Sequence, residues 1–331
     1  MDDFRKSSAT TDSFVLAKRP VGAPVLSDFK RISSPVIQEL KENEVRVHGL
    51  YYSVDPAEWN VGEVVKSEVV ARVAESKSSQ FRVGELVIGE FPWSTESVVL
   101  SDKVRKIDIQ KAFASEYLGV LGQSGLAAYF GLVEIGKPIA GETLVISGAS
   151  GAVGSLVGQI GKLFGCRVVG ITSSEIKMKF LTAHLGFHAS LNHLSDHFSE
   201  ELEQACPNGI DIYFDDVGGS LSDSVMKWMN HLSRVVICGQ ISSVCSEATV
   251  SGKRIESVLL NRSILMQGFR VSDYEKKVPA ANLKLTEWLT DGKIESTETI
   301  LRGFDRLPEA SSPHMKASKL GKMIVKAEDW L

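Results

Sequence analysis

Three glycines at regular spacing mark the part of the sequence whose chemistry is easiest to read. Gly148, Gly151 and Gly154 stand three residues apart, after the apolar run 144–146 and before a segment with apolar residues at helical spacing. Glycines in a strand-to-helix turn let the backbone approach a pyrophosphate, and the helix N-terminus supplies unpaired N–H groups. A purely structural turn is the alternative. A second apolar strand at 167–171 completes the unit that dinucleotide binding requires, so we predict that function.

The end of this second strand indicates which dinucleotide binds. An NAD site usually has Asp or Glu about 20 residues after the glycines, where the carboxylate bonds the ribose hydroxyls. This chain instead has Thr172, Ser173 and Ser174, followed by Glu175 at an expected helix start and by Lys177. Hydroxyl groups beside a cation suit a 2′-phosphate, which favours NADP(H). The alternative makes Ser173 or Ser174 only a helix N-cap and Lys177 a solvated residue, although a cap and a phosphate ligand can coexist.

The elements that must position this turn follow from the wider pattern. Residues 13–103 contain many short apolar or alternating runs separated by Gly and Pro, which indicates a small barrel or sandwich. After residue 106 the period changes, and helices alternate with strands. The pattern includes a helix over 221–230 and a strand over 233–239. Such alternation predicts a parallel sheet with crossover helices.

Composition excludes several functional classes. The 331 residues predict about two domains, and 43% hydrophobic with 24% charged residues is typical of a soluble globular protein. A net charge of −4 gives no basic footprint, so we do not expect nucleic acid as a main partner. No apolar run approaches the ~20 residues of a membrane span. The polar start lacks the apolar centre of a secretory signal, and residues 1–12 are expected to form a loose tail.

The cysteines and histidines do not predict a metal site. The four cysteines form no C-x-x-C pair, which favours reduced thiols and a cytoplasmic location: Cys166, Cys206, Cys238 and Cys245. A catalytic zinc needs three close ligands, and no such cluster appears early in the chain. The histidines between positions 184 and 197 fall across a helix end, a short strand and a loop. We therefore expect no zinc.

Motifs spread over most of the chain resemble a known family. They are SVDP at 53–56, LAAYFGL at 126–132, GAVG at 151–154, YFDDVGG at 213–219, ICGQIS at 237–242 and LGKMIV at 320–325. With these motifs the chain resembles the medium-chain dehydrogenase/reductases without zinc, and more closely the prostaglandin reductase or alkenal/one oxidoreductase branch.

The resemblance implies an architecture. A Rossmann-type doubly wound parallel sheet is inserted in a GroES-like β-barrel domain. The barrel would comprise residues 1–121, the NADP-binding domain residues 122–299, and residues 300–331 would return to the barrel. A homodimer joined through sheet edges is also implied.

The resemblance also implies an activity. Family members transfer a hydride from NADPH to the β-carbon of an α,β-unsaturated ketone or aldehyde, and the resulting enolate is protonated at the α-carbon. The expected substrate is a small or lipid-derived enone or enal. Two alternatives stay open, an NADPH quinone reductase and a low-activity NADP-binding protein.

Site residues carry over by position. The resemblance places Gly151, Ala152, Val153 and Gly154 on the pyrophosphate, and Lys177 on the 2′-phosphate, beside Ser173. It places Cys238, Gly239, Gln240, Ile241 and Ser242 under the nicotinamide, and Phe269, Arg270 and Val271 beside it. Tyr51 and Tyr52 are candidate proton donors by position, with packing in the strand core or an exposed aromatic surface as the alternative.

Four positions depart from the family pattern. His193 replaces a Tyr near the 2′-phosphate, and Asp216 replaces an Asn beside the cofactor. Val244 replaces a Tyr thought to face the substrate, and Lys319 replaces an Asn before L-G-K. A protonated His193 could pair with phosphate. A carboxylate at 216 should cost affinity for a cofactor that already carries several negative charges, unless a cation pairs it.

Overall fold

The chain folds into two compact units. A computed structural model describes residues 10–37, 39–55, 59–240, 252 and 254–327. One unit comprises Met1–Leu118 together with Thr299–Leu331, and the other is Gly119–Glu298. The second unit is therefore inserted between two segments of the first, as the predicted fold class requires.

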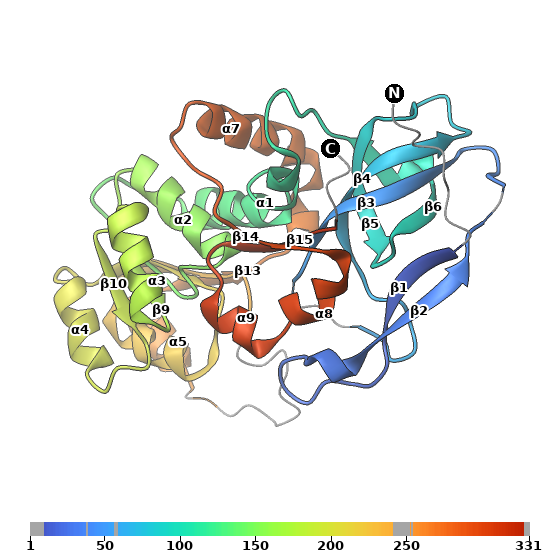
Figure 1. Ribbon diagram of the computed structural model, residues 1–331. Helices are drawn as coiled ribbons and strands as arrows, with labels where there is room; N and C mark the ends of the chain where they lie inside the picture. The colour runs from blue at the N-terminus through green and yellow to red at the C-terminus, as the bar shows by residue number, and fades with distance from the viewer. Residues whose placement is uncertain (1–9, 38, 56–58, 241–251, 253, 328–331) are drawn as a thin grey trace. The chain divides into compact units, whose positions relative to one another are not determined.

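The inserted unit is built on a parallel sheet (Figure 1). Among the described residues it has six strands in the order β10-β9-β8-β11-β12-β13, and the paired neighbours run parallel. The strands are β8 (Thr143–Ile146), β9 (Arg167–Thr172), β10 (Ala189–Asn192), β11 (Ile210–Asp215), β12 (Met229–Ile237) and β13 (Leu265–Gly268). The chain runs outward from β8 on one side and then returns to continue on the other. This reversal lies between β8 and β11, and open α/β sheets bind ligands at the carboxyl ends of the strands at such a point.

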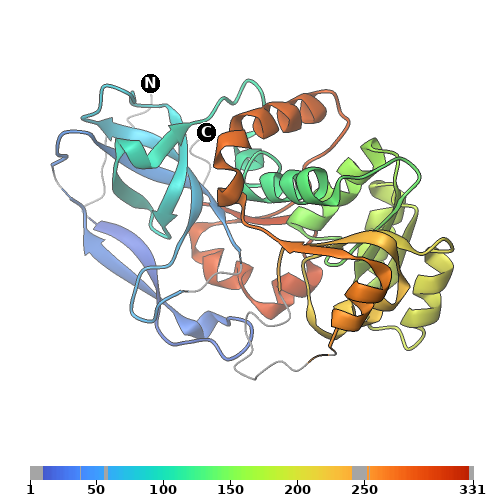
Figure 2. The same ribbon diagram turned by 180° about the vertical axis from the view of Figure 1, so that it is seen from behind.

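Helices cover both faces of this sheet, because alternate residues of a buried strand face opposite sides. One face carries α1 (Gln123–Tyr129), α2 (Ala152–Leu163), α3 (Glu175–Lys179) and α7 (Val278–Thr290). The other carries α4 (Phe198–Ala205), α5 (Gly219–Val225) and α6 (Glu256–Arg262), where Val145 and Val169 pack in one cluster with Leu202 and Leu221. Figure 2 shows β13 and α6, both orange, at one edge of the sheet. The predicted doubly wound sheet is confirmed.

The other unit is mainly antiparallel. Its larger sheet follows the path β14-β15-β3-β4-β5-β7, with β6 paired to β3, and β1 and β2 form a separate pair. The elements are β1 (Thr10–Leu16), β2 (Phe29–Pro35), β3 (Glu44–Ser53), β4 (Lys66–Ser76), β5 (Leu86–Pro92), β6 (Glu96–Leu100), β7 (Val104–Lys106), β14 (Glu298–Arg302), α8 (Leu307–Ala310), α9 (Pro313–Ser318) and β15 (Lys322–Lys326). Ile324 on β15 pairs with Ser53 on β3, so the last segment of the chain completes the sheet formed by the first.

The expectation of a loose N-terminal tail over residues 1–12 needs correction. Strand β1 begins at Thr10, so residues 10–12 belong to a sheet and not to a loose tail. Asp12 holds this strand in place through Ser33 and Arg31, whose guanidinium lies 2.6 Å from the carboxylate. Residues 1–9 lie outside the described part of the chain. Within that described part, no helix has both the length and the apolar character needed to cross a bilayer.

Candidate cofactor-binding site

The glycine turn joins the central strand β8 to helix α2. Gly148 has a φ of 61°, a left-handed conformation that glycine adopts without strain, and the Gly151 N–H donates to the Gly148 carbonyl at 2.9 Å. Gly151 is the N-cap of α2, and no side chain among the described residues caps this helix. The first-turn N–H groups and the positive end of the dipole are thus available to an anion.

Gly154 lets the helix begin close against this turn. A Cβ at this position would lie 2.6 Å from the Gly148 carbonyl oxygen and 2.7 Å from the Ala149 Cα, both backbone atoms. Only a residue without a side chain fits here without moving the backbone. Ala152 and Val153 stand between the two glycines in the first turn of α2, so the four residues predicted to hold the pyrophosphate form one continuous cradle.

The end of β9 carries the residues predicted to hold the 2′-phosphate. Ser174 is the N-cap of α3 and accepts from the Lys177 backbone N–H at 3.5 Å, so the cap falls on Ser174 and not on Ser173. The Lys177 residue is only 8% exposed, and burial lowers the pKa of its ammonium group. The structure therefore does not support the alternative in which Lys177 is a solvated helix residue. A buried ammonium group at this place provides the charge that a phosphate needs.

Thr172, the last residue of β9, connects this region to the glycine turn. Its hydroxyl lies 3.0 Å from the Ser150 hydroxyl, and its carbonyl lies 2.7 Å from Nδ1 of His193. Because a carbonyl can only accept, Nδ1 of His193 carries the proton. Nε2 is then the nitrogen left for another partner, and it can donate to a phosphate only when the ring is protonated.

Asp216 lies on the opposite side of the glycine turn, after β11. A Cβ at Gly148 would be 3.6 Å from its Oδ2, and the closest atom to a Cβ at Gly239 would be its Oδ1. The N–H groups of Cys238 and Gly239 both donate to the Asp215 carbonyl, at 2.8 and 3.2 Å. The sheet therefore brings Asp216, Cys238 and Gly239 beside the glycine turn. Gln240 follows directly, whereas the predicted residues Ile241 and Ser242, and also Val244, lie outside the described residues.

Phe269, Arg270 and Val271 follow β13. The Phe269 ring lies near Gly131, its centroid 6.3 Å from that of Tyr274, and Val271 is buried. Arg270 is exposed, and its N–H donates to Asp273 at 2.8 Å. The assignment of these three residues to the nicotinamide stays a prediction.

We expect the Cys238 thiol to be a poor nucleophile, although it lies beside the predicted cofactor site. Burial raises the pKa of its thiol, and the nearby carboxylates of Asp216 and then Asp215 raise it further. A thiol of this kind is not a nucleophile at neutral pH, which supports a packing role.

Alkylation tests this conclusion. At pH 7 we expect iodoacetamide to modify Cys238 at least about tenfold more slowly in the native protein than in the protein unfolded in guanidinium chloride, because only the thiolate reacts. Peptide mapping by mass spectrometry over time measures the two rates. Equal rates would show that the thiol is accessible and ionised.

The antiparallel unit holds the two candidate tyrosines. Tyr52 is 0% exposed, its hydroxyl donates to the Ser94 carbonyl at 2.7 Å, and burial raises its pKa. That placement favours the packing alternative for Tyr52. Tyr51 is half-buried, with the Lys326 ammonium 5.9 Å from its ring centroid. Lys319, the C-cap of α9, lies near enough to Asp55 to help lower the pKa of that carboxyl group.

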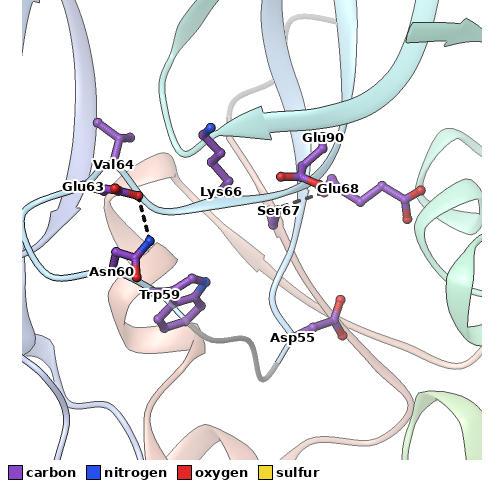
Figure 3. A pocket seen from close by; sticks show the side chains of 9 residues that line it. All are labelled: Asp55, Trp59, Asn60, Glu63, Val64, Lys66, Ser67, Glu68 and Glu90. Carbon is purple, nitrogen blue, oxygen red and sulfur yellow. Dashed lines mark hydrogen bonds between the residues drawn. The ribbon is translucent and has the colours of Figure 1, made fainter. Parts of the chain in front are cut away.

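This unit also contains a polar cavity of about 400 Å³ (Figure 3). It is lined by Asp55, Trp59, Asn60, Glu63, Val64, Lys66, Ser67, Glu68 and Glu90. Asp55 forms an ion pair with Lys322 on β15, with both carboxylate oxygens within 2.7 Å of an ammonium group that is almost fully buried. Burial acts to raise the pKa of Asp55, but Lys322 and the Ser53 hydroxyl outweigh it, so that pKa is lowered.

Glu68 is the unusual group of this cavity. It stands opposite Glu90 in the register of the paired strands β4 and β5, but the two side chains point away from each other (Figure 3). Burial raises the pKa of Glu68, and Asp55 adds to this, while Lys322 and Arg105 act against it. No local sequence pattern points to Glu68, because the groups that act on its carboxyl, Lys322, Arg105 and Asp55, come from other parts of the chain.

Stability measurements should detect the cost of burying this carboxylate. The folded protein holds a proton on Glu68 more tightly than the unfolded chain does, so this group's contribution to stability is greatest at low pH and declines as pH rises through its unfolded and then its folded pKa. At pH 8, Glu68→Gln should raise the free energy of unfolding by about 0.5 kcal/mol, because the amide has no charge to bury. Urea unfolding at pH 5 and pH 8 measures the change, with Glu90→Gln, whose side chain points away from Glu68, as the control. A gain from Glu68→Gln no larger than that from Glu90→Gln would contradict this effect of burial.

Among the described residues, no group of three or more His, Cys, Asp or Glu side chains is placed to hold a metal ion. The features gathered in the parallel sheet instead favour an anionic ligand. They are an uncapped helix after a glycine turn, a buried lysine beside the neighbouring strand, and a reversal of strand order between β8 and β11. Together they define a dinucleotide-binding α/β unit inserted into an antiparallel β unit.

Comparisons with known proteins identify the family. Residues 12–107 match the family model described as the N-terminal domain of oxidoreductase, and residues 152–287 match the model described as zinc-binding dehydrogenase. The putative NADP-dependent oxidoreductase YfmJ of Bacillus subtilis (strain 168) is 42% identical, over 97% of this chain and 99% of the relative. Prostaglandin reductase 1 of Bos taurus is 38% identical, over 95% and 98%.

A solved structure agrees with these relatives. CurA from Vibrio vulnificus in complex with NADPH is 36% identical, with a TM-score of 0.90 over 96% of this chain and 99% of that one. The chain belongs to the medium-chain dehydrogenase/reductase family, in its zinc-independent branch.

Proposed function

We propose that this chain is an NADPH-dependent reductase of the C=C bond of α,β-unsaturated ketones and aldehydes. The observation that carries the choice of cofactor is the buried residue Lys177, at the place where an NAD enzyme has a carboxylate. The names of its relatives, an NADP-dependent oxidoreductase and prostaglandin reductase 1, support the reaction class. The complex of CurA with NADPH supports the choice of cofactor.

Different residues of the chain would bind different parts of the cofactor. The glycine turn and the N-terminus of α2 would hold the pyrophosphate, and Lys177 would pair with the 2′-phosphate. When bound, NADPH supplies a hydride. In the proposed reaction the hydride forms a C–H bond at the β-carbon, the C=C π pair shifts to join the α-carbon to the carbonyl carbon, and the C=O π pair moves onto oxygen to give an enolate. A proton then reaches the α-carbon and restores the carbonyl. Correct placement of the reacting atoms carries most of such a rate enhancement.

Cofactor oxidation with three substrate classes tests the proposal. An enal, an enone and a quinone are incubated in parallel with enzyme and NADPH, and the loss of cofactor absorbance is followed. Turnover of the enal or enone, weaker with NADH, supports the proposal. Turnover of the quinone alone would instead establish the quinone reductase. NADPH binding without any turnover would indicate a low-activity binding protein.

Asp216 provides a prediction about affinity. Its carboxylate lies beside the glycine turn, where a negatively charged cofactor would approach. Asp216→Asn should therefore lower the Kd for NADPH by about threefold to tenfold, a gain of about 1 kcal/mol. Fluorescence titration at low and high salt measures the change, which should shrink as salt increases.

The matched control for Asp216→Asn is Asp291→Asn. Asp291 follows α7 and pairs with Lys293, so its substitution makes the same change in net charge on the surface. It should leave the Kd unchanged. Weaker binding by Asp216→Asn would show that the carboxylate is needed at this place.

A further inference from the structure

A buried carboxylate stands at the end of β11. Asp215 is 2% exposed, and its Oδ1 accepts hydrogen bonds from the Ser147 hydroxyl at 2.8 Å, the Tyr213 hydroxyl at 2.9 Å and the Gly218 N–H at 3.0 Å. The Val217 N–H lies at 3.2 Å from the same oxygen, and Oδ2 accepts from the Ser222 hydroxyl. A buried charge is stable only when it is bonded in this way. This number of donors on one carboxylate indicates that the backbone around it is closely fixed.

Ser147 connects this carboxylate to the glycine turn. Ser147 is 0% exposed and follows β8 directly, one residue before Gly148. Its hydroxyl donates to Asp215 and accepts from the backbone N–H groups of Asp216, at 2.9 Å, and Val217, at 3.2 Å. Its own N–H donates to the Phe214 carbonyl at 3.0 Å. One hydroxyl group thus joins the two turns that follow β8 and β11.

The turn at 216–219 depends on these bonds for its shape. Gly218 and Gly219 have φ values of 74° and 67°, so two successive residues have the positive φ that favours glycine. Glycine has the largest backbone freedom to lose on folding, and such a turn needs external bonds to keep one conformation. A Cβ at Gly148 would be 3.5 Å from the Val217 side chain, so the two turns are in contact.

The contact between the glycine turn and the 216–219 turn lies at the reversal of strand order, which a bound dinucleotide would span. Thr172 and Lys177 place the adenosine end on the β9 side of the glycine turn, whereas the 216–219 turn, Cys238 and Gly239 lie on the β11 and β12 side. A dinucleotide spans the point at which strand order reverses, so its nicotinamide half belongs on this second side.

We propose that Ser147 and Asp215 are positioning residues for the nicotinamide half of the cofactor. They hold the 216–219 turn in contact with the glycine turn, and so fix the position of the surface that the nicotinamide half contacts. The proposal rests on the proposed function in one respect, namely that the bound molecule is NADP(H).

Ser147→Ala and Ser222→Ala form a matched pair. Each removes one hydroxyl bonded to Asp215, but only Ser147 also holds the N–H groups of the turn. We expect Ser147→Ala to raise the Kd for NADPH about tenfold and to lower kcat. It should leave the Kd for adenosine 2′,5′-bisphosphate, which lacks the nicotinamide half, within about twofold. Ser222→Ala should leave both Kd values within about twofold.

A second variant keeps the proposal testable if Ser147→Ala fails to fold. Asp215→Asn keeps the shape of the side chain while removing its charge, and it should reproduce the selective loss of NADPH affinity. Ser147→Cys, with a weak donor of similar size, should restore part of it. Circular dichroism and thermal unfolding establish that each variant is folded.

Equal effects of Ser147→Ala and Ser222→Ala on NADPH, or equal losses for NADPH and the bisphosphate, would overturn the positioning role and leave a general structural one. Failure of the wild-type protein to bind NADPH would instead overturn the proposed function. The two failures are distinguished by the wild-type titration.

Discussion

Replacing Gly154 by alanine is expected to weaken NADPH binding about 100-fold, equivalent to about 2.7 kcal/mol. The added Cβ would lie 2.6 Å from the Gly148 carbonyl oxygen, 2.7 Å from the Ala149 Cα and 3.0 Å from the Gly148 carbonyl carbon. All three are backbone atoms of the turn, and none can rotate away. The start of α2 must therefore move away from the turn, and the cradle for the pyrophosphate opens. Fluorescence titration with NADPH measures the loss.

Gly151→Ala is the matched control, three residues earlier in the same turn. Its Cβ would meet one atom, the Gly148 carbonyl oxygen, at 3.1 Å, and its φ of −81° suits any residue. We expect a much smaller loss, of about threefold, and little change in Tm. Comparable losses from the two substitutions would mean that close packing at Gly154 is not what shapes the cradle.

The sequence was most informative where structure depends on neighbouring residues. The glycine turn with the strand and helix around it, and the Ser and Lys residues after β9, were all predictable, because each signal lies within one βαβ unit. Burial of Lys177 was not, since it depends on how α3 packs. The network of Ser147 and Asp215 was not predictable either. These residues are 68 positions apart and meet only because β8 and β11 are neighbours in the sheet.

The boundaries of helices and strands were also only partly predictable from the local sequence. The apolar pattern at 221–230 predicts one helix, but α5 ends at Val225 and a short 3₁₀ turn leads into β12 at Met229. Ile210 on β11 pairs with Met229, and the register then shifts before Ile212 pairs with Arg234. Pairing with a strand elsewhere in the chain overrides the local helical pattern, and no neighbouring residue signals it.

Lys177→Ala is expected to remove the preference for NADPH over NADH. The Lys177 residue is 8% exposed, so the attraction of its charge to a 2′-phosphate is less screened than at an open surface. Loss of such a buried charge partner costs about 2 kcal/mol, which is a roughly 30-fold rise in the Kd for NADPH. NADH lacks the phosphate, and its Kd should change by less than about twofold. Lys179→Ala, an exposed lysine on the same helix, is the control and should change neither value.

The pH dependence separates this role from simple packing. Burial lowers the pKa of Lys177 in the free protein, and only the protonated form attracts phosphate. A bound 2′-phosphate would raise that pKa again, so NADPH binding takes up a proton wherever Lys177 of the unliganded protein has lost it. The affinity for NADPH should then fall as pH rises through the lowered pKa, while the affinity for NADH stays level. The Kd for NADH divided by the Kd for NADPH, measured from pH 7 to 10, should decline as pH rises in the wild-type protein. In Lys177→Ala this ratio should stay near one. A wild-type ratio that does not change with pH in this range, with a variant that still prefers NADPH, would place the 2′-phosphate on other residues.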